Sequence, residues 1–298
     1  GETLTYDQYG IPSIVLADGP GGIRVKQKYE AKNVETGETA TYYQYCTAWP
    51  VDFVLAQSWD TDLLKRIGEA FGKELEEMNI TILLGPSLNI HRDPLCGRNF
   101  EYYSEDPFLS GTLAASVTKG VQCRKGCGVT IKHFACNNQE FKRHDANAIV
   151  SERALREIYL KGFEIAVKQG GAYSIMSTYG PVNGLWTAGS YDLLTTILRK
   201  EWGYQGIVMT DWWAKINEEG EPGSGKQTIP MVRAQNDIYM VTADAASNSN
   251  KDNTAEGLAD GRLTRAQLMR NAANICCFLL RSVAMERLLG REEEECTE

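Results

Sequence analysis

The sequence contains no apolar run that approaches the roughly 18 residues of a bilayer-spanning helix, so it predicts no membrane segment. Basic residues are also in the minority, with 31 Lys and Arg against 39 Asp and Glu and a formal net charge of -8. No cluster of Lys and Arg stands out, which argues against binding to nucleic acid or to an anionic membrane surface. The chain is 43% hydrophobic over 298 residues, enough for one large core or two modest ones.

Candidate metal ligands are equally sparse. The 8 cysteines are scattered, and the pairs Cys276 with Cys277 and Cys123 with Cys127 have no His or Cys cluster beside them to complete a metal site. We therefore expect no metal and no cofactor, and we expect the cysteines to be free thiols or small buried side chains. Free thiols favour a reducing compartment, so the expected location is cytoplasmic. No signal peptide is visible after Gly1, which is weak evidence in a chain that does not begin with Met.

Short apolar runs recur along the chain, each rich in β-branched residues and bounded by turn residues. This pattern is typical of buried parallel strands. The runs cover residues 13–17, 81–84, 129–132, 172–177, 206–210 and, more weakly, 237–241, while 52–57 is ambiguous between strand and helix.

Longer segments between these runs show helical periodicity. In 62–78 the apolar residues fall three and four apart on one face, and 151–166 repeats the pattern. Thr264 and Gln267 form a capping-box pattern at the start of a further helix. The alternation of strands and helices predicts an α/β fold. Six or seven such units favour a (β/α)8 TIM-like barrel over an open sheet, with an irregular or incomplete ring allowed.

The domain organisation follows from composition. The polar stretch 27–47 predicts a long loop or small hairpin, and 217–227 predicts a loop rich in Gly and Glu. Long loops at one end of a barrel usually shape its binding site. We assign residues 1–290 to one barrel domain and 291–298 to an acidic C-terminal tail.

The active site of a parallel α/β barrel lies where its strands end. The residues at those ends are Asp18, Lys132, His133, Met176, Tyr179, Asp211 and Trp212, and the loop after 81–84 adds Arg98. A sugar pocket needs such charged partners for hydroxyls and aromatic platforms for the ring. Plainer interpretations stay open. Asp18 can be a turn former, Lys132 and His133 a core pair, the tryptophans core aromatics, and Arg98 with Glu101 a structural ion pair.

Several longer motifs surround these residues in a fixed order. Residues 83–107 read LLGPSLNIHRDPLCGRNFEYYSEDP. They are followed by Lys132-His133-Phe134, Glu152-Arg153, Met176-Ser177, Val182-Asn183-Gly184, the stretch 198–206 and Thr210-Asp211-Trp212. Over residues 10–215 this arrangement strongly resembles glycoside hydrolase family 3, and the remainder resembles it loosely. The resemblance implies a (β/α)8 barrel with glycosidase activity.

The resemblance also implies roles for the charged residues. Asp211 matches the nucleophile of the family, a carboxylate that attacks the anomeric carbon, and an ionised carboxylate on a rigid element suits this task. Asp18 would bind hydroxyls far from the anomeric centre, and Arg98, Lys132 and His133 would hold other ring hydroxyls. Charged partners strengthen such hydrogen bonds.

Four further residues are assigned to the pocket by the same resemblance. Arg24 matches a family arginine near the site. Met176 and Tyr179 would line the pocket, with Tyr179 close to the nucleophile. Trp212 would stack on the sugar or cap it.

A retaining mechanism needs a second carboxyl group, about 5–5.5 Å from the first, to protonate the leaving oxygen. In the glucosidase branch of the family this group is a Glu on an α/β-sandwich domain. Glu101, Glu140 and Glu152 match family positions that look structural. We therefore expect the acid/base on an α/β-sandwich domain outside residues 1–298, in the same polypeptide or a second chain. Some members place it before the barrel, which fits a start at Gly1.

Two positions bear on the branch of the family. The N-acetylglucosaminidase branch carries Lys-His-Phe-Pro-Gly-His-Gly and a His-Asp acid pair, whereas this sequence reads Lys-His-Phe-Ala-Cys-Asn-Asn-Gln-Glu, and His144-Asp145 lacks the surrounding pattern. The xylosidase branch usually has Glu where Asp18 stands, and the shorter Asp leaves room for a hydroxymethyl group. The resemblance thus implies a retaining exo-β-glycosidase, a β-glucosidase acting on small β-glucosides or oligosaccharides.

Several alternatives stay open. Within the family, a β-xylosidase or a β-galactosidase shares much of the signature loop. A Schiff-base aldolase using Lys132 is a different class of enzyme, since barrels do carry lysine nucleophiles. A sugar-binding barrel that is inactive without its partner domain is the non-enzymatic alternative. The sequence leaves homo-oligomerisation open.

Overall fold

The central feature of the molecule is a five-stranded parallel sheet. A computed structural model of the chain describes residues 1–290, with sheet strands β1 (Leu16–Asp18), β4 (Ile82–Leu84), β5 (Gly128–Phe134), β6 (Ser174–Ser177) and β9 (Ile207–Met209). The strands pair in this same order, so each lies beside the next sheet strand of the chain. A doubly wound sheet reverses its order at a switch point, whereas an unreversed order is that of a (β/α)8 barrel.

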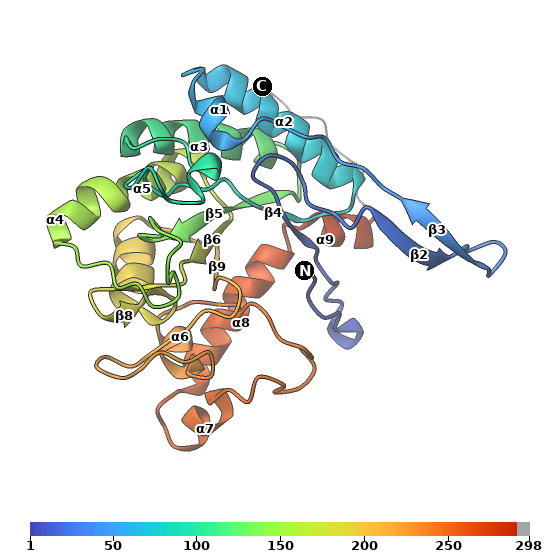
Figure 1. The fold of residues 1–298 in the computed structure, drawn as a ribbon. Coiled ribbons are helices and arrows are strands. Elements are labelled where there is room, and N and C mark those ends of the chain that lie inside the picture. Colours follow the sequence, from blue (N-terminus) through green and yellow to red (C-terminus); the bar gives the residue numbers. More distant parts are fainter. Residues whose placement is uncertain (291–298) are drawn as a thin grey trace.

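Helices and two small hairpins make up the other elements. The hairpins are β2 (Lys28–Lys32) with β3 (Thr39–Tyr43), which projects from the body in Figure 1, and β7 (Pro181–Val182) with β8 (Leu185–Trp186). The α-helices are α1 (Asp52–Ala56), α2 (Thr61–Glu77), α3 (Pro107–Gln122), α4 (Glu152–Ala154), α5 (Lys161–Ile165), α6 (Thr228–Arg233), α7 (Thr254–Ala259), α8 (Arg265–Leu279) and α9 (Val283–Leu288). Short 3-10 helices are η1 (Asp7–Tyr9), η2 (Asn99–Glu101) and η5 (Thr187–Gly189), and π-helical segments are η3 (Leu155–Tyr159), η4 (Ala166–Gly170) and η6 (Asp192–Glu201).

The barrel is incomplete over the described residues. The sixth strand expected at 237–241 is reduced to a single bridge between Met209 and Ile238, so the expectation of a full strand is wrong. The reason lies in Asp237, whose carboxylate Oδ2 accepts a hydrogen bond of 2.9 Å from the backbone N–H of Val208. The side chain of Asp237 thus accepts the hydrogen bond from β9 that a backbone carbonyl of a regular neighbouring strand would accept.

Other expected elements are present with shifted ends. The capping box of Thr264 and Gln267 begins α8. The ambiguous segment 52–57 forms helix α1, and the stretch 27–47 contains the β2–β3 hairpin. The acidic tail expected at 291–298 lies outside the described residues.

The state of the cysteines bears on the expected location of the protein. Six cysteines are free thiols, namely Cys46, Cys96, Cys127, Cys136, Cys276 and Cys277. Cys123 is disulfide-bonded, so the expectation of a free thiol is wrong for that residue. The cytoplasmic location stays a prediction. Within residues 1–290, none of the helices combines the length and the apolar character needed to cross a membrane.

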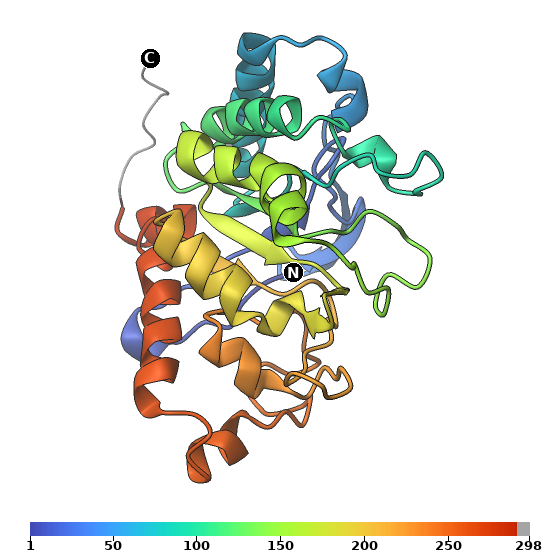
Figure 2. The ribbon, with the colours of Figure 1, turned by 90° about the vertical axis from the view of Figure 1, so that its left-hand side faces the viewer.

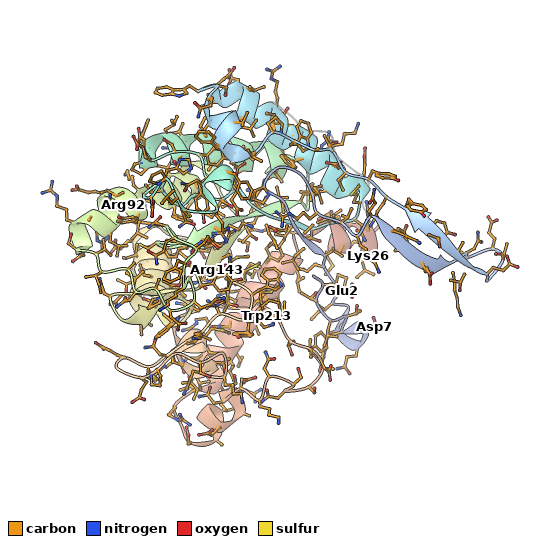
Figure 3. The ribbon with its side chains drawn as sticks, viewed as in Figure 1. Glu2, Asp7, Lys26, Arg92, Arg143 and Trp213 are labelled. Carbon is orange, nitrogen blue, oxygen red and sulfur yellow. The ribbon has the colours of Figure 1, made fainter. Side chains whose placement is uncertain are left out.

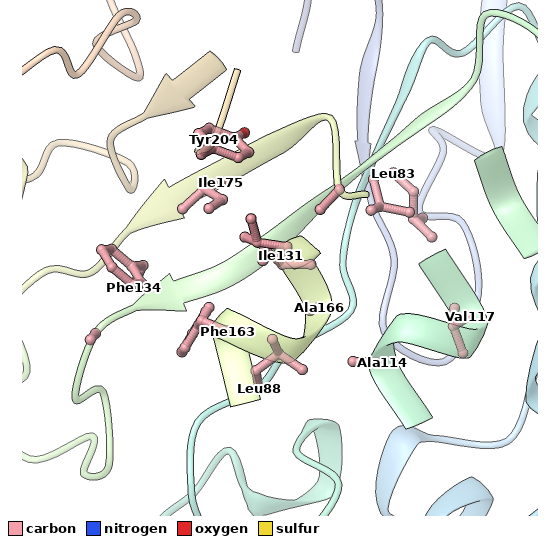
Figure 4. Close-up of a cluster of buried hydrophobic side chains, with 14 of the residues drawn as sticks. Leu83, Leu88, Ala114, Val117, Ile131, Phe134, Phe163, Ala166, Ile175 and Tyr204 are labelled. Atoms are coloured by element: carbon pink, nitrogen blue, oxygen red, sulfur yellow. The ribbon is translucent and has the colours of Figure 1, made fainter. Parts of the chain in front are cut away.

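Buried apolar side chains cover both faces of the sheet. On the outer face Leu83, Ile131 and Ile175 of the strands pack with Val117 and Phe163 of the helices, as Figure 4 shows. Alternate residues of the strands turn to the other face and form a second cluster, which includes Leu16, Ile82, Leu84, Met176, Ile207 and Met209. This alternation is the two-residue period of a strand, and burial on both faces explains why the runs are almost wholly apolar.

Glycines let the outer helices approach closely. Helix α2 packs along α3, and α3 packs against α5 and η4; these helices follow one below another in the upper half of Figure 2. A Cβ on Gly120 would lie 2.1 Å from the carbonyl oxygen of Lys65 and 2.8 Å from the Cα of Gly68. The two backbones are therefore in direct contact, and a side chain at this crossing must push the helices apart.

Substitution of Gly120 by Ala tests this contact. We expect Gly120→Ala to lower the free energy of unfolding by about 1–3 kcal/mol, because the added methyl group overlaps backbone atoms that have no freedom to move. Urea unfolding followed by circular dichroism measures the change. The exposed Lys119 on the same helix provides the control, and Lys119→Ala should alter stability by less than about 0.5 kcal/mol. Equal stability of the Gly120→Ala protein and the wild type would contradict the close packing.

Candidate active site

A cavity of about 520 Å³ opens at the carboxyl ends of the sheet strands. Its lining contains every residue that the sequence singled out, namely Asp18, Arg24, Arg98, Lys132, His133, Met176, Tyr179, Asp211 and Trp212. These residues are spread over almost 200 positions of the chain. They meet because parallel strands bring their carboxyl ends to one edge.

Asp18, the last residue of β1, is held between two cations. Its Oδ1 accepts a hydrogen bond of 2.7 Å from the Nζ of Lys132, and its Oδ2 lies 3.1 Å from a guanidinium nitrogen of Arg24. Burial tends to raise the pKa of Asp18, but the charge and hydrogen bond of Lys132 and the charge of Arg24 outweigh it, so the pKa is lowered. Asp18 is therefore an ionised acceptor at the cavity wall, with lone pairs left for ligand hydroxyls.

Arg98 and Glu101 form the ion pair that the plainer interpretation proposed. The Nε of Arg98 donates to Oε1 of Glu101, and the hydroxyl of Ser87 donates to Oε2 at 3.2 Å. Both members of the pair also line the cavity. The pair thus fixes a guanidinium whose remaining N–H groups are available to a ligand.

His133 lies beside Lys132 at the end of β5, where the pairing of β5 with β6 shifts register between Ile131 and Phe134. Such irregularities re-aim side chains near functional sites. Its Nε2 lies 3.7 Å from Oδ2 of Asp211, beyond hydrogen-bond range. Burial, followed by the charges of nearby cations, holds the pKa of His133 well below its usual value, so the imidazole is neutral.

Asp211 follows β9 and is only 5% exposed. Its Oδ1 accepts a hydrogen bond of 2.7 Å from the backbone N–H of Trp212. Its Oδ2 is buried without a hydrogen-bond partner among the described residues. Burial raises the pKa of Asp211 to about 6, against the opposing effects of the Trp212 N–H, the charges of Arg98 and Lys132 and the hydroxyl of Tyr179. At neutral pH the carboxylate is therefore mainly ionised, with one oxygen uncommitted.

Three charged or aromatic side chains of the cavity were not assigned from the sequence. Arg143 lines it and stacks over the ring of Tyr179, with the guanidinium carbon 4.5 Å from the ring centroid. Trp213 lines it from an exposed position, and Figure 3 shows Arg143 and Trp213 near the middle of the molecule. Glu101 completes the set. Arg143 comes after β5, but eight residues separate it from the end of that strand at Phe134, so spacing alone does not reveal it.

Further carboxylates near the site are committed elsewhere. Glu140 forms an ion pair with Arg143 at 2.8 Å, and Glu152 pairs with Arg156 on the surface at 3.0 Å. Asp145 pairs with Lys215 at 2.6 Å. Together with Glu101, which is bound to Arg98, these are the acidic residues that the sequence analysis considered as a possible acid/base.

The arrangement suits a polyhydroxylated ligand. Carboxylate, guanidinium, ammonium and imidazole groups line the cavity, and Tyr179 and Trp212 add aromatic rings. The uncommitted oxygen of Asp211 can act as a nucleophile toward a carbon held against it. An α/β barrel with this site defines the catalytic barrel of a glycoside hydrolase.

Comparison with known proteins identifies the family. The model of the Glycosyl hydrolase family 3 N terminal domain matches residues 14–277, so the chain belongs to glycosyl hydrolase family 3. The chain is 49% identical over 287 residues to a β-glucosidase of Ruminococcus albus, covering 96% of this chain and 28% of that protein. It is 39% identical over 263 residues to an exo-α-(1→6)-L-arabinopyranosidase of Bifidobacterium breve, covering 88% of this chain and 32% of that protein.

A solved structure agrees with the fold. The crystal structure of a β-glucosidase from Paenibacillus barengoltzii matches with a TM-score of 0.84 and 54% identity, covering 97% of this chain and 29% of that one. The chain thus spans 28% and 32% of the length of the two curated relatives. The range of the family model, residues 14–277, nevertheless includes all nine site residues from Asp18 to Trp212.

Replacement of Asp211 by Asn should stabilise the protein at neutral pH. The folded state raises the pKa of Asp211 from 3.8 to about 6, so it binds this proton more tightly than the unfolded chain, and ionisation costs stability as pH rises through this window. We expect Asp211→Asn to add about 2–3 kcal/mol to the free energy of unfolding at pH 7.5 and little at pH 4. Urea unfolding at both pH values measures the difference.

The exposed Asp7 provides a control for the same chemical change. Asp7→Asn should produce no such gain at pH 7.5. A gain from Asp211→Asn that is equal at pH 4 and pH 7.5 would show that the carboxylate charge is not its source.

Proposed function

We propose that the protein is a retaining exo-β-glycosidase, a β-glucosidase, in which Asp211 is the nucleophile. The observation that carries the proposal is the buried Oδ2 of Asp211, which has no hydrogen-bond partner among the described residues and belongs to a residue that lines the charged cavity. A buried acceptor without a partner lowers the stability of the fold. Such groups are retained where a function requires them. A sugar carbon brought to it would meet an ionised, weakly solvated carboxylate.

The proposed reaction has two steps. In the first, Asp211 attacks the anomeric carbon while the glycosidic bond breaks and the leaving oxygen takes a proton from an acid. In the second, a water molecule attacks the same carbon, gives its proton to that same group, and releases Asp211. The net result is hydrolysis with retained configuration. The cations Arg98 and Lys132, which lower the pKa of Asp211, help to keep it ionised for the first step.

The hydroxyl contacts follow from the cavity wall. Asp18 offers carboxylate oxygens, and Arg24, Arg98 and Lys132 offer N–H donors around the same space. Charge-assisted hydrogen bonds of this kind select a terminal sugar over an apolar ligand. Tyr179, Met176 and Trp212 complete the wall, with Trp212 proposed to stack on the ring.

The acid/base is proposed to lie outside residues 1–298, on an α/β-sandwich domain. Within the chain Glu101, Glu140 and Glu152 are each bound by an arginine. Each carboxylate is thus committed to a neighbouring side chain of the barrel and is not placed to reach a leaving oxygen. Glycosidic bond cleavage by residues 1–298 alone should therefore be slow, and the second carboxyl group has to come from another domain of the same polypeptide or a second chain.

Glucose is the proposed substrate sugar. It is supported by the β-glucosidases of Ruminococcus albus and Paenibacillus barengoltzii and by Asp18, whose short side chain leaves room for a hydroxymethyl group. The arabinopyranosidase of Bifidobacterium breve favours one second candidate, cleavage of a pentopyranoside that lacks this group. For Lys132, the hydrogen bond to Asp18 supports a binding role over Schiff-base formation.

Covalent labelling tests the nucleophile. A 2-deoxy-2-fluoroglucoside should form a stable ester with Asp211 in the full-length protein, located by peptide mass spectrometry. Asp211→Asn should abolish labelling and lower kcat by about 10⁴-fold or more. Asp145→Asn, which breaks only the ion pair with Lys215, should leave labelling intact. A label on another residue sinks the assignment, and glucose binding without labelling or turnover would indicate a sugar-binding barrel.

Substrate preference tests the role of Asp18. We expect kcat/KM for an aryl β-D-glucoside to exceed those for the β-D-xyloside, the β-D-galactoside and the α-L-arabinopyranoside. Asp18→Glu should reduce kcat/KM for the glucoside about 10- to 100-fold relative to the xyloside, because the added methylene fills the space for the hydroxymethyl group. Asp18→Asn removes the charge without filling that space and separates the two effects. A wild type that prefers a pentopyranoside overturns the glucosidase proposal.

A further inference from the structure

Asn89 is a buried residue behind the cavity that makes three contacts with one partner. It lies in the loop after β4 and is 2% exposed. Its Nδ2 donates to the carbonyl oxygen of His133 at 2.9 Å, and its Oδ1 accepts from the backbone N–H of His133 at 2.9 Å. The same Oδ1 lies 3.1 Å from Nδ1 of the His133 ring. The side chain of Asn89 thus pairs with the backbone of His133 as a neighbouring strand would.

These contacts determine which way the amide of Asn89 is turned. Exchange of its oxygen and nitrogen would place an NH2 against the backbone N–H of His133 and an oxygen against its carbonyl. Both contacts would then be repulsive in a buried site, so only the observed orientation is satisfied. The atom of Asn89 that faces Nδ1 of His133 is therefore an acceptor.

An acceptor beside Nδ1 decides the tautomer of the imidazole. Nδ1 of His133 must carry the hydrogen, and in a neutral ring Nε2 then has a bare lone pair. Neutrality is supported by burial and by the cations around the ring, Arg98, Lys132 and Arg143, all of which lower its pKa. The edge of Tyr102 packs against the same ring, with centroids 6.4 Å apart.

We propose that Asn89 is a positioning residue that fixes His133 as the Nδ1–H tautomer, so that Nε2 enters the cavity as a hydrogen-bond acceptor beside the nucleophile. Nε2 of His133 and Oδ2 of Asp211 are then two acceptors 3.7 Å apart. Neither satisfies the other. A ligand group that contacts Nε2 must therefore donate a hydrogen bond. This step rests on the proposed function: the donor is then a hydroxyl group of the sugar.

This tautomer also leaves Oδ2 of Asp211 without a hydrogen bond from His133. If the hydrogen sat on Nε2, His133 would point a donor at the carboxylate oxygen that we propose as nucleophile. Asn89 prevents this contact from behind, although it does not line the cavity itself. Its effect on the reaction is therefore carried entirely through His133.

Nitrogen-15 NMR of the imidazole rings tests the proposal on the full chain. The sequence has 3 histidines, so a histidine-labelled protein gives few signals, and loss of one set in His133→Gln assigns that ring. We expect His133 to be neutral and protonated on Nδ1 at pH 7. His91 is an internal control of opposite sense, because its Nε2 lies 2.9 Å from the carbonyl oxygens of Asn99 and Tyr102 and must donate. A His133 ring protonated on Nε2, or doubly protonated, overturns the proposal.

Two variants of Asn89 separate positioning from folding. Asn89→Leu removes the acceptor, and the hydrogen of His133 should move to Nε2, where Asp211 can accept it. kcat/KM for the glucoside should then fall about 10-fold or more. Asn89→Asp keeps an acceptor at Nδ1 but loses the donor to the carbonyl oxygen of His133, so it should be less stable and still keep a hydrogen on Nδ1. If neither variant folds, the tautomer of His133 in the wild type decides the proposal. An unchanged tautomer in folded Asn89→Leu would contradict the role of Asn89.

Addition of glucose separates this inference from the proposed function. The Nε2 signal of His133 should move as a hydroxyl donates to it, while the ring stays neutral. Protonation of Nε2 on glucose binding overturns the acceptor assignment. If His133 is the Nδ1–H tautomer but Asp211 is neither labelled nor needed for turnover, the proposed function fails while the positioning role of Asn89 stands.

Discussion

The charged groups of the cavity are arranged around one buried carboxylate, that of Asp211. Asp211 is almost fully buried, and burial raises the pKa of its carboxyl. The backbone N–H of Trp212, the charges of Arg98 and Lys132 and the hydroxyl of Tyr179 oppose that effect, and the pKa is about 6. The balance leaves a charged group with one unsolvated, unpaired oxygen. Such a group is unfavourable for stability and well suited to forming a bond with a sugar carbon.

The surrounding charges are arranged so that none of them neutralises Asp211 by direct pairing. Lys132 is held by Asp18, and Arg98 is held by Glu101. Each cation therefore acts on Asp211 over a distance while its own hydrogen bonds fix its position. The same pairing commits the carboxylate of Glu101 to Arg98 and to the hydroxyl of Ser87.

Polar side chains also take over backbone hydrogen bonds where the strands end. Asn89 pairs with the backbone of His133 at the end of β5, and Asp237 accepts from Val208 of β9. Both side chains form hydrogen bonds with backbone groups that would otherwise need a longer neighbouring strand as partner. Short strands can then stop at the edge of the sheet and present side chains to the cavity instead of continuing the ladder.

The sequence by itself determined the class of fold and most of the site. Apolar runs ending in polar residues identified β1, β5, β6 and β9 and, at their ends, Asp18, Lys132, His133 and Asp211, because a buried parallel strand has a local signature and its end has a fixed role in a barrel. Only the tertiary structure decided what depends on contacts between distant segments. It reduced the expected strand 237–241 to one bridge, added Arg143 to the cavity, and set the pKa of Asp211 and the tautomer of His133. Hydrogen-bond partners, burial and the electrostatic effect of nearby charges depend on residues that are distant in the sequence, so no local pattern of residues encodes them.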